Sequence, residues 1–183
     1  MSKTLLAGAS LAIVLTACGG PMTATEYVDA LNALVESGRS DLEASVMAYG
    51  QIAEPTVAES VAFIEREIAI RGEFLEGFEA LDPQESLAEV HGVLGDVLLR
   101  LLAAAEGLVA AADSVSSVEE AEQTPEFAEY EAANADGTRA CLEVQELLDD
   151  LVASGDAFAD VAWIPDVGLA VRAVLGCGDL DTS

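Results

Sequence analysis

The sequence predicts an all-α protein, an up-and-down four-helix bundle closed by a short C-terminal helix. Apolar residues recur at spacings of three and four through most of the chain, which is the period of an amphipathic helix. Aromatic residues make up only 5% of the chain, and alanine, the best helix former, supplies much of its apolar content. No clear alternation of apolar and polar residues indicates a strand. Four long helical patterns with short connections favour a bundle.

The first two predicted helices begin at capping boxes, in which a threonine and the glutamate three residues later cap the helix reciprocally. Thr23 and Glu26 start a helix over 24–48, and Thr56 and Glu59 start the second. The predicted apolar stripes of these helices are Tyr27, Leu31, Leu34, Val35, Leu42, Val46 and Tyr49, and Val57, Val61, Ile64, Ile68, Leu75 and Phe78.

Prolines mark the starts of the third and fourth helices, because proline fits the first helical turn. Asp82-Pro83 predicts a third helix over 83–113, and Thr124-Pro125 predicts a fourth that ends near Gly155. The polar segment between these two helices is expected to be a connector. A final short helix is expected over 165–175.

The third helix is almost entirely apolar from Val97 to Ala112, so a membrane span is an alternative for it. Arg100 and Glu106 interrupt this stretch, and both are costly in lipid. We therefore interpret it as a buried helix whose alanines allow close packing.

The start of the chain has the pattern of an export signal. Lys3 precedes an apolar run of about a dozen residues, which is too short for a membrane span. The run ends in Leu15-Thr16-Ala17-Cys18. This leader resembles the signal peptide and lipobox of bacterial lipoproteins, in which the cysteine receives a diacylglycerol and becomes the new N-terminus. The resemblance implies a covalent diacylglycerol and fatty acid such as palmitate on Cys18. An ordinary secretory leader with a chance cysteine is the alternative.

This reading divides the chain into a signal peptide (1–17), a tether (18–22) and a single helical domain (23–183). It predicts a protein held by its lipid on the extracytoplasmic face of the cell membrane. Beyond that lipid, the sequence predicts no cofactor.

Two further cysteines, Cys141 and Cys177, would meet an oxidising compartment after export, where paired thiols usually form a disulfide. Such a bridge would hold the final helix onto the fourth and stabilise the fold by roughly 3–4 kcal/mol. The alternative is a metal site that uses both thiols and His91, the only histidine, but zinc sites prefer clustered cysteine spacings.

The charge of the chain limits its partners. With 34 acidic and 7 basic residues the formal charge is −27, which leaves no basic surface for nucleic acid. Six glutamates between Glu119 and Glu131 form the densest acidic run, interpreted as a solvated connector and helix face. Binding of a divalent cation or a basic partner is the alternative. Glu67 with Arg71 and Asp96 with Arg100 are expected to form exposed ion pairs along their helices.

The sequence does not predict a catalytic site. No carboxylate stands three or four residues from His91, and no Gly-x-Ser-x-Gly motif is present. We therefore expect His91 to be a surface or boundary residue. Asn134, Asp136 and Glu143 match part of an EF-hand loop, but Ala132 occupies its first position, so we interpret the match as a coincidence.

The most apolar segment outside the long helices contains Phe158, Trp163 and Ile164. We expect it to plug the open end of the bundle. The alternative is an exposed anchor for a protein partner, since tryptophan is common in such anchors.

Together these observations predict a non-enzymatic structural or protein-interaction module, with an envelope protein as its partner. A lipoprotein that binds a solute or a divalent cation is the alternative, with a pocket between helices or a site on the acidic connector. A hydrolase of envelope polymers is a third reading.

Overall fold

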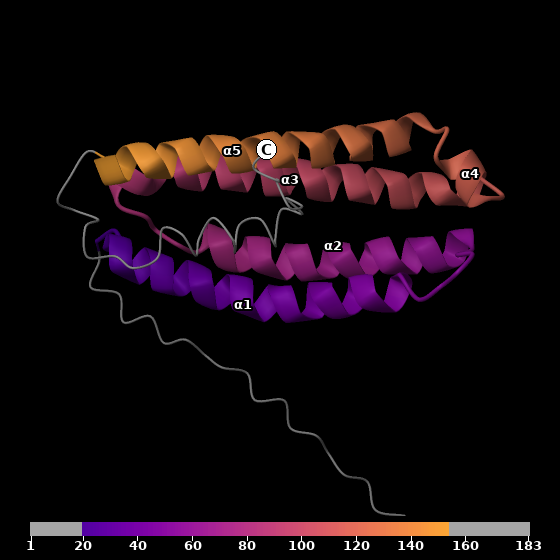
Figure 1. The fold of residues 1–183 in the computed structure, drawn as a ribbon, viewed down its shortest axis with the longest axis horizontal. Helices are drawn as coiled ribbons and strands as arrows, with labels where there is room; N and C mark the ends of the chain where they lie inside the picture. The colour runs from indigo at the N-terminus through magenta and orange to yellow at the C-terminus, as the bar shows by residue number, and fades with distance from the viewer. Residues whose placement is uncertain (1–19, 154–183) are drawn as a thin grey trace, which may run out of the picture.

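A computed structural model describes residues 20–153, and this part of the chain is all-α, as predicted (Figure 1). Its single β pairing is an isolated bridge between Met22 and Pro83. The long helices are α1 (Ala24–Tyr49), α2 (Val57–Glu79), α3 (Ala88–Ala111) and α5 (Pro125–Ala153). The short elements are two 3₁₀ turns, Glu85–Leu87 and Ala112–Ser114, and the one-turn helix α4 (Val118–Ala121).

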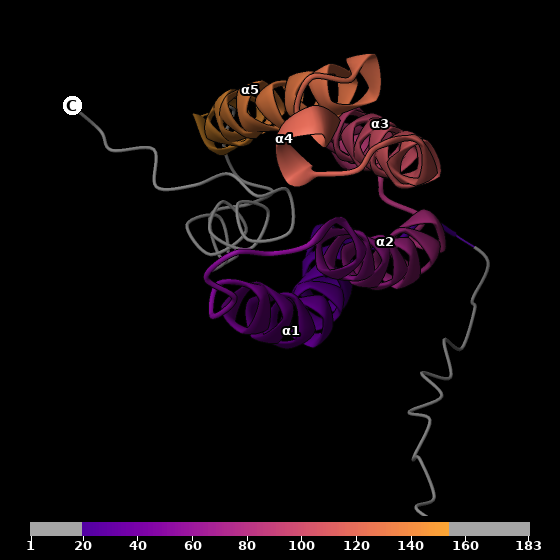
Figure 2. The ribbon, with the colours of Figure 1, turned by 90° about the vertical axis from the view of Figure 1, so that its right-hand side faces the viewer.

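The long helices lie in two layers, α1 beside α2 and α3 beside α5 (Figure 2). Consecutive long helices run antiparallel, so the end of α1, the start of α2, the end of α3 and the start of α5 share one end of the molecule. The extensive interfaces join α1 to α2, α2 to α3, and α3 to α5. Within the described residues, the α2–α3 interface is therefore the one that joins the two layers.

Both predicted capping boxes are present. The Thr23 hydroxyl accepts a hydrogen bond from the backbone N–H of Glu26 at 3.3 Å, and the Glu26 carboxylate accepts one from the N–H of Thr23 at 2.9 Å. Thr56 and Glu59 repeat this arrangement at the start of α2. These hydrogen bonds favour the charged carboxylates and lower the pKa values of Glu26 and Glu59.

The core lies between the layers and is centred on α3. The apolar stripe predicted for α3 is buried over most of its length, whereas α1 and α2 are less completely covered at their shared end. Val46, predicted to be buried, is 50% exposed. The most completely buried large side chains are Tyr27, Val28, Leu31, Phe78, Leu87, Val97, Leu98, Leu101 and Val144.

The boundaries of the third helix differ from those predicted. Pro83 does not begin a helix, because the adjacent Asp82 carbonyl instead accepts a hydrogen bond from the N–H of Met22 at 2.7 Å. This bond fixes the start of the described chain to the α2–α3 connection. The α-helix begins only at Ala88, after the 3₁₀ turn Glu85–Leu87.

The predicted connector after α3 contains the short helix α4, which sequence analysis missed. The Ser117 hydroxyl caps it by accepting a hydrogen bond from the N–H of Glu120 at 3.2 Å. The following helix, α5, is continuous through Asn134 and Asp136. These residues therefore do not form the loop of an EF-hand.

Several expectations lie outside the described residues: the signal peptide 1–17 with Cys18, the segment containing Phe158, Trp163 and Ile164, and the final helix 165–175 with Cys177. Cys141 belongs to α5, but its side chain also lies outside the description. No helix within the described residues is long and apolar enough to cross a bilayer, including the apolar third helix.

Candidate functional site

An apolar cavity of about 240 Å³ lies at the end of the molecule where α1 ends and α2 begins. The connection from α3 through α4 to α5 forms its other side. We call this site the apolar cavity, and its principal lining residues are Tyr49, Ser60, Phe63, Ala111, Phe127 and Tyr130. Apolar clefts of this kind are typical of binding sites for small molecules.

Aromatic rings form much of the wall of the apolar cavity. The rings of Tyr49 and Phe63 stack with centroids 4.3 Å apart and an angle of 13° between their planes. Phe127 and Tyr130 come from the first turns of α5. The helices thus present flat apolar faces to the enclosed space, which suit a ring or a branched hydrocarbon.

A hydrogen-bonded polar pair lies in the apolar wall, which also includes Glu122 and Thr124. The hydroxyl of Tyr49 and the Oγ of Ser60 are 2.8 Å apart, and either can be the donor. Because a hydroxyl has two acceptor lone pairs besides its proton, this pair retains hydrogen-bonding capacity toward a bound molecule. It would fix the orientation of a ligand that carries a hydroxyl or carbonyl group.

The apolar cavity is not filled by side chains because small residues line one side of it. Ala111 ends α3, Ala112 begins the following 3₁₀ turn, and Ala121 belongs to α4. Leu108, one turn earlier in α3, is only 7% exposed, so the well-packed core stops there. Where leucine gives way to alanine, the helices leave a space that their own side chains do not fill.

A second hollow adjoins the apolar cavity and shares Val57, Val115, Val118 and Glu122 with it. Its carboxylates are Glu54, Glu119 and Glu122, and we call this surface the acidic depression. All three glutamates are exposed. The described residues that line the cavity and the depression include no lysine, arginine or histidine. The electrostatic field at this end of the molecule is therefore negative.

Glu120, between two of these glutamates, has a different role. Its carboxylate accepts hydrogen bonds from the N–H and the hydroxyl of Ser116, both at 2.8 Å, and these bonds lower its pKa. The described residues supply no such partner for the carboxylates of Glu119 or Glu122. These two groups are free to meet a cation.

A buried ion pair on α2 lines a groove between α1, α2 and α5 that shares Phe63 and Tyr130 with the apolar cavity. Arg71 donates to Glu67 at 3.0 Å, and the two side chains are only 8% and 6% exposed. The sequence predicted this ion pair as an exposed one, and the predicted exposure was wrong. Removing one partner would leave a buried charge, at a cost of about 3–5 kcal/mol. The Nε of Arg71 has no hydrogen-bond partner among the described residues.

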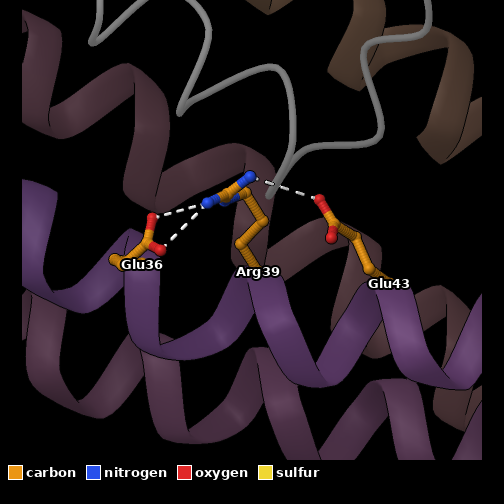
Figure 3. Close-up of polar contacts among 3 residues, drawn as sticks. All are labelled: Glu36, Arg39 and Glu43. Atoms are coloured by element: carbon orange, nitrogen blue, oxygen red, sulfur yellow. Dashed lines mark hydrogen bonds and ion pairs between the residues drawn. The ribbon is translucent and has the colours of Figure 1, made fainter.

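Arg39 lies on the same groove and is held by two glutamates of α1 (Figure 3). It donates to both carboxylate oxygens of Glu36, at 2.8 and 2.9 Å, and to Glu43 at 3.4 Å. The hydrogen bonds and charge of Glu36 raise the pKa of Arg39, with a smaller contribution from Glu43. The two arginines of the groove are thus both paired with carboxylates, which weakens any attraction for an anion.

The second predicted ion pair has a different partner. Arg100 donates its Nε–H to the backbone carbonyl of Asp96 at 3.2 Å, while its Nη1 contacts Asp136 on α5 at 3.4 Å. Arg139 contacts the same carboxylate. The pairing therefore joins α3 to α5 instead of lying along α3. In the described part of the chain, no three histidine, cysteine, aspartate or glutamate residues are grouped so as to hold a metal ion.

His91 is a boundary residue, as expected, and it joins α3 to α1 and α2. Its Nδ1 lies 3.0 Å from the hydroxyl of Tyr27, and its ring stacks on Phe78 with centroids 4.1 Å apart. Burial lowers the pKa of His91 and raises that of Tyr27. Its described partners are a phenol and a phenyl ring, so the arrangement serves packing.

None of the site residues singled out from the sequence belongs to the apolar cavity as described. Cys18, Cys177, Phe158, Trp163 and Ile164 lie outside the described residues, and the side chain of Cys141 does too. The cavity residues were missed because Tyr49, Phe127 and Tyr130 were interpreted as helix-face residues. One signal was available, since the four aromatic residues of the cavity all fall close to predicted helix ends.

Comparison of the chain with protein-family models, with curated proteins and with solved structures finds no significant match.

The position of His91 predicts a dependence of stability on pH. Because the folded-state pKa lies below the ordinary value of 6.5, the unfolded chain binds the proton more readily. The contribution of His91 to the free energy of unfolding is therefore complete above pH 6.5. It falls as the pH is lowered below 6.5, by at most about 1.4 kcal/mol per pH unit.

Urea unfolding of the wild type and His91→Gln at pH 7.5, 6.5 and 5.5 measures this effect. The carboxylates titrate alike in both proteins, so the difference between the two free energies isolates His91. We expect the free energy of unfolding of the wild type to exceed that of His91→Gln by less at pH 5.5 than at pH 7.5. A constant difference would show that His91 titrates as it does in the unfolded chain.

Proposed function

We propose that this chain is a lipid-anchored, extracytoplasmic binding protein whose helical domain holds a small apolar molecule. The observation that carries the proposal is the apolar cavity, with its stacked Tyr49–Phe63 wall and its Tyr49–Ser60 hydroxyl pair. Among the roles that the sequence leaves open, a cavity of this kind favours solute binding over a purely structural role. The chemistry is that of binding, without a catalytic step.

The size of the cavity supports a ligand larger than one ring. Apolar protein cavities of about 150 Å³ already accept benzene. The 240 Å³ of this cavity leaves space for a two-ring or branched aliphatic body. Transfer of apolar surface from water contributes about 25 cal/mol per Å², which is the main driving force for such a ligand.

The anchor is proposed from the leader. Cleavage before Cys18 would leave a diacylglycerol-bearing N-terminus, a tether over 18–22 and the helical domain, on the outer face of the cell membrane. Two or more acyl chains hold a protein firmly, because each buried methylene contributes about 0.8 kcal/mol. The excess of 34 acidic over 7 basic residues supports this arrangement, since the protein surface itself would be repelled by anionic lipids.

We also propose that the four long helices form an up-and-down bundle completed by the C-terminal residues. A Cys141–Cys177 disulfide would join the final helix, 165–175, to α5. Export supports this pairing, since it would bring both thiols to an oxidising compartment.

A second candidate function is docking of an envelope protein. Neighbouring apolar side chains on α1, Val46 and Met47, are 50% and 67% exposed. Exposed apolar residues of this kind are found in protein interfaces. The hollow that these two residues line shares Phe63 and Tyr130 with the apolar cavity, so a docked protein would lie beside the bound solute.

The anchor predicts a specific modification. Cells supplied with labelled palmitate should incorporate the label into the wild type and not into Cys18→Ser, which should leave the membrane fraction. Cys177→Ser serves as the matched control, since it removes a cysteine without touching the lipobox. Equal labelling of wild type and Cys18→Ser would refute the anchor.

The disulfide predicts the number of free thiols. The oxidised protein, unfolded in guanidinium without reductant, should show no reactive thiol from Cys141 or Cys177, and two after reduction. Loss of the bridge should lower the free energy of unfolding by roughly 3–4 kcal/mol. Two reactive thiols before reduction would exclude the bridge.

The apolar cavity predicts binding of a neutral fluorophore. The fluorescence emission of N-phenyl-1-naphthylamine should increase when the wild type is added. It should not increase with Ala111→Phe, because the phenylalanine ring would occupy the cavity. Ala69→Phe, at an exposed position of α2, is the control and should bind like the wild type. Thermal unfolding of both variants checks that the fold survives. Undiminished emission with a folded Ala111→Phe would place the binding site elsewhere.

A further inference from the structure

The apolar cavity and the acidic depression are adjacent hollows of different chemistry. Four residues line both, and Glu122 is the carboxylate common to them. A molecule seated in the cavity therefore extends toward Glu54, Glu119 and Glu122 if it is longer than the cavity itself. The apolar cavity suits an apolar body, and the acidic depression suits a positively charged head group.

From this geometry we infer that the site binds a cationic amphiphile, an apolar body that carries a protonated amine. The inference rests on the proposed binding function and specifies its ligand class. The body occupies the space between the Tyr49–Phe63 stack and Phe127. The ammonium group lies over the acidic depression, where Glu119 and Glu122 are exposed and unpaired within the described residues.

The charges around the site exclude the opposite class of ligand. A carboxylate or sulfonate head group would find no described cation in the lining and would face three glutamates. The charge of −27 adds to this repulsion and raises the local concentration of cations. An ammonium ion without an apolar body would gain little, because exposed ion pairs contribute only about 0.2–1 kcal/mol each.

A set of three ligands with the same two-ring body tests the inference: 1-naphthylmethylamine, 1-naphthylmethanol and 1-naphthoate. Each displaces N-phenyl-1-naphthylamine from the purified full chain at pH 7.5, where the amine is protonated. If the chain carries its lipid, phosphatidylcholine nanodiscs hold it and empty nanodiscs give the blank. We expect the amine to bind about fivefold more tightly than the alcohol, and the naphthoate to bind most weakly.

Variants assign the preference to the acidic depression. Glu119→Gln with Glu122→Gln should lower the affinity for the amine to the affinity that the same variant shows for the alcohol. The control double variant, Glu65→Gln with Glu73→Gln, removes the same charge from exposed positions on α2 outside the depression and should retain the preference.

Each outcome separates the inference from the function on which it rests. Equal binding of amine and alcohol overturns the cationic preference and leaves the apolar site intact. Equal loss of the amine preference in both double variants assigns it to the overall charge and overturns the role of the depression. If both double variants still bind the amine more tightly than the alcohol, the role of the acidic depression is also overturned. If neither the fluorophore nor any naphthyl ligand binds, the proposed function fails as well.

Discussion

The packing of α3 against both α2 and α5 holds the two layers of helices together. Leu94, Val97, Leu98 and Leu101 are each at most 3% exposed, and truncation of a buried leucine typically costs about 2–5 kcal/mol. The same helix ends in alanines, and the apolar cavity opens at that end. The large residues in the middle of α3 thus contribute to the core, and the alanines at its end contribute to the candidate site.

Excess negative charge is the second constraint on this molecule. Three glutamates, Glu26, Glu59 and Glu120, lie in the first turns of helices. Their carboxylates accept hydrogen bonds from N–H groups at or just before the helix start. Arg39 and Arg71 are each paired with glutamates. The acidic surface that remains attracts cations and repels anions, so electrostatics restrict the ligands that reach the cavity.

The helices could be predicted because their signals are local. Capping boxes and apolar periodicity lie within single segments, and both predicted α1 and α2 closely. The short helix α4 was missed because four residues carry too weak a pattern. The burial of the Glu67–Arg71 pair could not be predicted, because spacing sets the pairing while neighbouring elements set the exposure.

The candidate site was hidden from sequence analysis for a similar reason. It requires the end of α1, the start of α2 and the α3–α5 connection to meet, and no local pattern encodes such a meeting. Likewise, Tyr27 and His91 are 64 positions apart and become hydrogen-bond partners only in the fold. Their residue types were evident in the sequence, but their contacts were not.

The Met22–Asp82 hydrogen bond determines the end of the molecule at which the described chain begins. It holds the first described residues at the end of α1 opposite the cavity, and α1, with 26 residues, is about 39 Å long. If Cys18 bears the lipid, four residues before Met22, the lipid would be attached at the end of the domain far from the apolar cavity. Only a domain that lies along the membrane surface would then bring the mouth of the cavity near the headgroups.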